Sequence, residues 1–149
     1  ICVAPDVGGT ARARALGKML NIDLAIIDKR RPKPGKSEVM NVIGKVYNKT
    51  CIIVDDIIDS GGTIVNAAKA LKNNGAKDVH VYCSHGVLSG NAVEKIKNSK
   101  VKNLVITDTI DNISKVKKAK NIEILTISHL VGEAIKRISN STSVSDLFN

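Results

Sequence analysis

Short apolar runs alternate with longer amphipathic stretches along the chain, and this alternation predicts the elements of the fold. Short, mostly apolar runs bounded by polar residues are typical of strands that are covered on both faces. Such runs predict strands at residues 1–4, 24–27, 51–54, 79–83, 104–107 and 122–127. Stretches with helical spacing of apolar residues lie between them, at residues 11–20, 64–72, 92–98, 113–119 and 130–138.

This order of elements predicts an α/β fold, with a parallel β-sheet flanked by helices. The chain has 149 residues, which is the length of one ordinary domain, and we interpret residues 1–149 as a single domain. In sheets of this kind, ligands bind at the carboxyl ends of the strands. The loops that follow the predicted strands are therefore the places to look for a site.

The net charge of +9 favours an anionic partner. Binding of single-stranded nucleic acid usually adds stacking aromatic residues to a basic surface. Here the aromatic residues are Tyr47, Tyr82 and Phe148, and none lies in a basic cluster. A basic enzyme that acts on phosphate esters fits as well as an RNA-binding protein, so the charge alone does not decide. Only with the segments described below do we expect no nucleic-acid partner. No apolar run approaches the roughly 18 residues of a membrane helix, so no membrane partner is expected either.

The three cysteines, Cys2, Cys51 and Cys83, lie far apart in strand-like runs. They form no CxxC or CxxH pattern of the kind that binds zinc. Buried free thiols are typical of proteins in a reducing compartment, so we expect a cytoplasmic location.

Residues 51–63 read C-I-I-V-D-D-I-I-D-S-G-G-T and carry the clearest chemical signal. Gly61 and Gly62 allow the backbone to approach an anion closely. Amide groups at the start of the following helix would point at that anion, and the helix dipole favours its negative charge. Ser60 and Thr63 add hydroxyl donors, so the segment predicts a cradle for one phosphate monoester.

Asp55 and Asp56 would repel a phosphate, so they suit sugar hydroxyls or a Mg²⁺ ion held between substrate groups. The alternative is an acidic loop followed by a helix cap at Asp59 or Ser60. Two acids, two apolar residues, a third acid and S-G-G-T are harder to explain as capping alone.

This segment resembles the 5-phosphoribosyl-1-diphosphate (PRPP) binding loop of the type I phosphoribosyltransferase fold. Residues 4–13 (A-P-D-V-G-G-T-A-R-A) are similar to the P-D-x-G-G-x-x-R-A segment of ribose-phosphate diphosphokinases, the PRPP synthetases. Residues 28–32 (D-K-R-R-P) resemble their flexible loop, and residues 84–90 and 143–148 resemble later segments. The resemblance covers nearly the whole chain. It implies the C-terminal half of a two-domain parent, whose similar N-terminal half would precede Ile1.

The resemblance implies an enzyme that transfers the diphosphoryl group of ATP to the 1-hydroxyl of ribose 5-phosphate, giving PRPP and AMP with Mg²⁺. It implies a homo-oligomeric parent. Lys29 and Arg31 of the D-K-R-R segment, which leads into an exposed loop at residues 30–37, would close over the ATP phosphates as catalytic residues. Asp6 would be linked to the metal.

The resemblance also implies a binding site and a regulatory site. The residues that would bind ribose 5-phosphate are Asp55, Asp56, Asp59, Ser60, Gly61, Gly62 and Thr63. In the C-terminal tail, Ser143, Ser145 and Phe148 would contribute to a regulatory site.

Two other functions share parts of this pattern. A PRPP-dependent base phosphoribosyltransferase has the same loop but consumes PRPP, and a non-catalytic regulatory relative keeps the fold alone. The D-K-R-R and P-D-x-G-G segments favour the synthetase. Because the family's ATP site draws on the other half of the protein, we expect this chain to bind the sugar phosphate but to be inactive alone.

Overall fold

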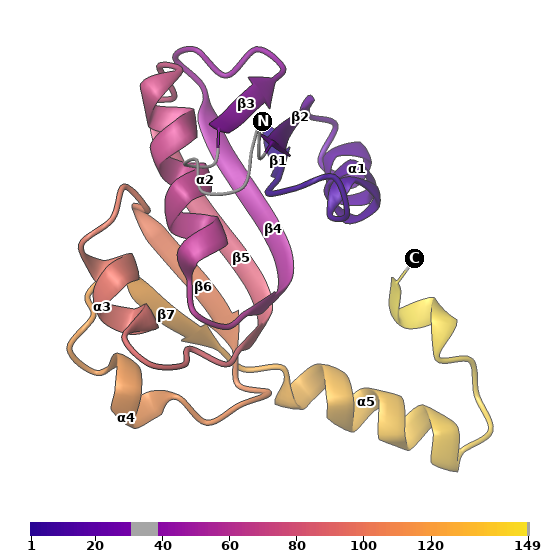
Figure 1. Ribbon diagram of the computed structural model, residues 1–149. Helices are drawn as coiled ribbons and strands as arrows, with labels where there is room; N and C mark the ends of the chain where they lie inside the picture. Colours follow the sequence, from indigo (N-terminus) through magenta and orange to yellow (C-terminus); the bar gives the residue numbers. More distant parts are fainter. Residues whose placement is uncertain (31–38, 149) are drawn as a thin grey trace.

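The computed structural model describes residues 1–30 and 39–148, and in this part of the chain one sheet of seven strands forms the centre of the molecule (Figure 1). The strand order is β3-β2-β1-β4-β5-β6-β7. The strands are β1 (Cys2–Ala4), β2 (Leu24–Arg30), β3 (Val39–Ile43), β4 (Thr50–Ile58), β5 (Asp78–Gly86), β6 (Asn103–Thr107) and β7 (Ile122–Leu125). The helices are α1 (Thr10–Met19), α2 (Gly62–Asn73), α3 (Ala92–Lys97), α4 (Ile113–Val116) and α5 (Ser128–Ser139), with a 3₁₀ turn η1 (Ser145–Phe148).

The sheet is parallel except at one edge, where β3 runs antiparallel to β2. The prediction of an α/β fold with a parallel sheet and flanking helices is confirmed, and the antiparallel strand β3 is an addition at one edge of that sheet. The sequence pattern missed β3 and ended β2 at Ile27, because Asp28, Lys29 and Arg30 interrupt the apolar run. These residues pair with the edge strand, where Asp28 lies opposite Asn41 and Lys29 opposite Met40. Strand β2 thus continues to Arg30 because its backbone pairs with the edge strand β3, and not because its side chains continue the apolar run.

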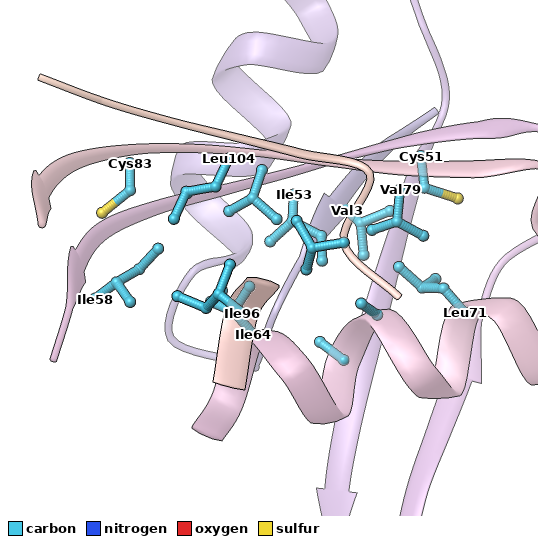
Figure 2. Close-up of a cluster of buried hydrophobic side chains, with 14 of the residues drawn as sticks. Val3, Cys51, Ile53, Ile58, Ile64, Leu71, Val79, Cys83, Ile96 and Leu104 are labelled. Carbon is cyan, nitrogen blue, oxygen red and sulfur yellow. The ribbon is translucent and has the colours of Figure 1, made fainter. Parts of the chain in front are cut away.

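Alternation along the strands divides the core into two layers. On one face of β1, Cys2 and Ala4 pack with Ala13 of α1. On the other face, Val3 belongs to a larger cluster under α2, α3 and α4. Figure 2 shows this larger cluster, in which Ile53 and its neighbours on the sheet face the side chains of α2 and α3. Because the central strands are covered on both faces, they carry nearly continuous apolar runs at the centre of the sheet.

Strands β4 and β5 extend further than the apolar runs predict. The acids Asp55 and Asp56 lie within β4, and Ile57 and Ile58 continue the strand beyond them. Asp55 lies opposite Cys83 of β5, and Ile58 lies opposite Gly86. The carboxylates are therefore fixed on a hydrogen-bonded strand rather than on the loop that follows it.

The predicted helix at residues 130–138 is confirmed as α5, which stands away from the sheet in Figure 1. This helix has no buried residue, and its apolar side chains are exposed: Leu130, Val131, Ile135 and Ile138. Among the described residues, no helix is both long and apolar enough to cross a membrane.

Candidate functional site

A pocket of about 310 Å³ lies where β1 and β4 end and α2 begins. β1 is the strand at which the order of the sheet reverses, since β2 follows on one side and β4 on the other. Ligands bind at such a switch point in open α/β sheets. The residues that line the pocket are Asp6, Asp55, Asp56, Ile57, Ile58, Asp59, Ser60, Gly61, Gly62, Thr63 and Ile64.

The chain turns into α2 at Gly61, which has a left-handed backbone with φ of 75°. No side chain caps the start of α2. The first amide groups of a helix have no partner within the helix, so they are available to another acceptor. Here they adjoin a pocket, and the helix dipole adds partial positive charge to them. This end of the pocket is suited to an anion.

Backbone hydrogen bonds from the segment after β5 hold the loop before Gly61 in place. The amide of Leu88 donates to the carbonyl of Ile58 over 3.1 Å, and that of Ser89 donates to the carbonyl of Asp59 over 3.1 Å. The carbonyl groups of Ile58, at the end of β4, and of Asp59, in the loop, are thus both paired within the protein.

The pocket lining also contains the two acids of β4, Asp55 and Asp56. Arg12 of α1 contacts both acids of β4: its Nη1 lies 3.2 Å from Oδ1 of Asp55, and its Nη2 lies 2.7 Å from Oδ2 of Asp56. Burial raises the pKa of Asp55 above its ordinary value, and the adjacent charge of Asp56 adds to this effect. A side-chain hydrogen bond with Asp55 is the main cause that lowers the pKa of the exposed Asp56. The pair thus places acidic side chains in the same pocket as the start of α2.

Asp6 also lines the pocket, and its Oδ1 accepts a hydrogen bond from the amide of Gly9 over 2.8 Å. Carboxylate oxygens are the donors that Mg²⁺ prefers. Within residues 1–30 and 39–148, however, no group of three or more His, Cys, Asp and Glu residues is arranged to hold a metal. Asp6 therefore fits Mg²⁺ as one ligand of an ion whose other ligands come from outside this group, such as substrate oxygens and water.

The structure brings the predicted residues of the phosphate loop, the acidic pair and Asp6 into one pocket, but not the other candidates. Lys29 lies in β2 and does not line this pocket. Arg31 lies outside the described residues. The tail residues Ser143 and Ser145 bond to each other over 2.9 Å, and Phe148 is exposed; none of them lines the pocket.

Two contributions to the site were missed by the sequence analysis. Ile57 and Ile64 form apolar parts of the lining, and Arg12 contacts the acidic pair from 43 positions earlier in the chain. The available signal for Arg12 was its place in the P-D-x-G-G-x-x-R segment.

The fold and this pocket define an α/β domain of the type I phosphoribosyltransferase fold. A crystal structure of a purine phosphoribosyltransferase from Pyrococcus horikoshii matches 84% of this chain with a TM-score of 0.51 and 22% identity, which is a likeness of fold alone. Phosphoribosylpyrophosphate synthetase from Mycobacterium smegmatis is more similar, with a TM-score of 0.83 and 34% identity over 93% of this chain and 44% of its own.

Residues 25–149 match the model of the phosphoribosyl synthetase-associated domain, and the chain belongs to that family. A curated relative, the ribose-phosphate pyrophosphokinase of Bradyrhizobium diazoefficiens, is 60% identical over 147 residues. That alignment covers 99% of this chain and 46% of the relative. The chain thus spans about half the length of the curated relatives it matches.

Proposed function

We propose that this chain is the sugar-phosphate-binding half of a ribose-phosphate pyrophosphokinase, also called ribose-phosphate diphosphokinase. The whole enzyme would transfer the diphosphoryl group of ATP to the 1-hydroxyl of ribose 5-phosphate, giving PRPP and AMP. The observation that carries the proposal is that one pocket is lined both by the uncapped start of α2 and by the two carboxylates of β4. A sugar phosphate has an anionic end and a hydroxyl-bearing end, and it fits this arrangement in one direction.

In this proposal the phosphate group lies at the start of α2. Amide groups at Gly61, Gly62 and Thr63 would donate to its oxygens, and the hydroxyls of Ser60 and Thr63 would add further donors. Asp59 would belong to the same binding loop, which the amide of Ser89 holds by donating to the carbonyl of Asp59. Charge-assisted hydrogen bonds of this kind are stronger than neutral ones, so the phosphate anchors the ligand.

The ribose hydroxyls would donate to Asp55 and Asp56. Both carboxylates line the pocket, and a carboxylate accepts several hydrogen bonds at once. A phosphate cannot occupy this end without facing two like charges. The acidic pair therefore sets the direction in which ribose 5-phosphate binds.

The remaining roles concern the transfer step. Asp6 would provide one ligand to Mg²⁺, which when bound neutralises charge on the transferring phosphates. Lys29 and Arg31 would supply cationic stabilisation of the same group. We propose Ser143, Ser145 and Phe148 as part of a regulatory site between subunits of a homo-oligomer.

We also propose that residues 1–149 form one domain, the C-terminal half of the whole protein. The chain would bind ribose 5-phosphate without transferring the diphosphoryl group, because the ATP site would need the other half. The three free, buried cysteines suit a protein of the cytoplasm.

Isothermal calorimetry with ribose 5-phosphate tests the binding proposal. Thr63→Val removes one hydroxyl from the loop, and we expect about tenfold weaker binding, the value of one charge-assisted hydrogen bond. Thr50→Val is the matched control, because Thr50 is exposed at the opposite end of β4. Equal binding by the wild-type chain and Thr63→Val, or no binding by the wild-type chain, would overturn this assignment.

A further inference from the structure

We propose that Arg12 is a positioning residue that holds Asp55 and Asp56 in the arrangement that receives the hydroxyls of the sugar. This inference rests on the proposed function, since it assigns the way in which the hydroxyl-bearing end of the pocket is built. Arg12 itself is not among the residues that line the pocket. It acts on the ligand through the two carboxylates.

The guanidinium group of Arg12 bridges the two carboxylates. Arg12 lies in the first turn of α1, and each of its two terminal nitrogens contacts a different carboxylate, at 3.2 Å and 2.7 Å. The side chain of Asp55 is only 17% exposed, whereas those of Arg12 and Asp56 are 37% and 61% exposed. A planar guanidinium with fixed donor directions fixes the orientation of both acceptors, which a single ammonium group cannot do.

The acidic pair needs such a bridge for two physical reasons. Neighbouring residues of a strand direct their side chains to opposite faces, so Asp55 and Asp56 do not converge on one ligand by default. Two adjacent carboxylates also repel each other, and one of these is largely buried. A cation between them reduces the repulsion and draws both groups to the same end of the pocket.

Backbone amides complete the arrangement. The amide of Asp56 donates to Oδ1 of Asp55 over 3.0 Å, and the amide of Ile57 donates to Oδ1 of Asp56 over 2.9 Å. Each acid is therefore held by its own strand at one oxygen, and Arg12 bridges the two. The acids accept from fixed donors and retain further lone pairs for a ligand.

Arg12 also connects two parts of the site, the turn that holds Asp6 and the acids of β4. α1 begins directly after the turn in which Asp6 accepts the amide of Gly9. The same short segment thus places Asp6 in the pocket and, one helical turn later, brings a cation to the acids of β4. Movement of α1 would displace both groups together.

The test compares two ligands that use different ends of the pocket. Calorimetry is run with ribose 5-phosphate and with inorganic phosphate on the wild-type chain, Arg12→Met and Arg12→Lys. Arg14→Met is the matched control, because Arg14 is an exposed arginine of the same helix. We expect Arg12→Met to weaken ribose 5-phosphate binding about tenfold and to leave phosphate binding within about twofold of wild type. Arg12→Lys should restore part of the loss, and Arg14→Met should change neither affinity.

A double-mutant cycle separates positioning from a general effect on folding. If Arg12 acts through the acids, adding Arg12→Met to Asp56→Asn should weaken binding less than the same change does in the wild-type chain. Unchanged ribose 5-phosphate affinity in Arg12→Met, equal losses for both ligands, or full additivity would each overturn the inference. Absence of ribose 5-phosphate binding by the wild-type chain would instead overturn the proposed function on which it rests.

Discussion

Gly61 packs against Ile96 so closely that a β-carbon on Gly61 would lie 3.3 Å from two carbon atoms of that side chain. Gly61 also has a positive φ of 75°, which residues with a β-carbon rarely adopt. The contact joins the start of α2 to α3, and Ile96 is fully buried beneath it. The position of the candidate phosphate loop thus depends on a glycine at this place.

Gly61→Ala is expected to lower the free energy of unfolding by about 1–2 kcal/mol and to weaken phosphate binding, because strain and contact both displace the loop. Gly62→Ala is the matched control for stability. A β-carbon there would approach nothing closer than Ser60 Oγ at 3.9 Å, so we expect no loss of stability and a gain of up to about 1 kcal/mol. Urea denaturation of both variants measures the difference, and equal stabilities would refute this account of the loop.

The cysteines should be unreactive in the folded chain. Cys2, Cys51 and Cys83 are free and buried, and burial raises the pKa of the Cys83 thiol to about 11. An acid with a raised pKa stays protonated until the pH exceeds that value, and the thiolate is the reactive form. At pH 8 we expect negligible reaction with a disulfide reagent such as DTNB and complete reaction of three thiols in denaturant. Rapid labelling of one thiol in the folded chain would contradict the assignment of that cysteine as buried.

Helix α5 is expected to contribute little to the stability of this chain despite its apolar residues. Leu130 of α5 is 43% exposed, whereas Leu71 of α2 is fully buried. The same substitution at the two sites is informative. Leu71→Ala should cost about 2–5 kcal/mol through loss of burial and the cavity left behind, and Leu130→Ala should cost less than about 1 kcal/mol. Comparable losses in urea denaturation would mean that α5 packs on the domain.

The separation of ligand binding from catalysis gives a further prediction. If the chain is half of the catalytic unit, it should bind ribose 5-phosphate and form no AMP from ATP and ribose 5-phosphate. The positive control is the whole ribose-phosphate pyrophosphokinase of Bradyrhizobium diazoefficiens, which should form AMP under the same conditions. Sustained turnover by the 149-residue chain would show that its own residues suffice for the transfer.

The parts of the fold that sequence could predict are those whose signal is local. Continuous apolar runs marked the central strands, because both their faces are covered. The edge strand β3 was missed because half-exposed positions carry no such run, and β4 was ended too early because Asp55 and Asp56 interrupt its pattern although the backbone continues. Pairing with β5 extends β4 to Ile58. This pairing joins residues far apart in the chain, so the local sequence does not predict it.

In the candidate site, too, local features could be predicted from the sequence, whereas contacts between distant residues could not. The phosphate loop at residues 59–63 is one contiguous segment with a distinctive composition, and it could be found from sequence. The contact of Arg12 with the acidic pair joins residues 43 positions apart. It arises because α1 and β4 both adjoin β1 in the folded sheet, and only the three-dimensional arrangement shows it.

The central claim is that the pocket at the start of α2 binds ribose 5-phosphate in one direction. An NMR titration of the isotope-labelled chain with ribose 5-phosphate tests it most directly. We expect saturable shifts of the amide signals at residues 59–63 and at Asp55 and Asp56, while inorganic phosphate shifts only the first group. Shifts confined to other parts of the chain, or no saturable shift at these residues, would contradict the account.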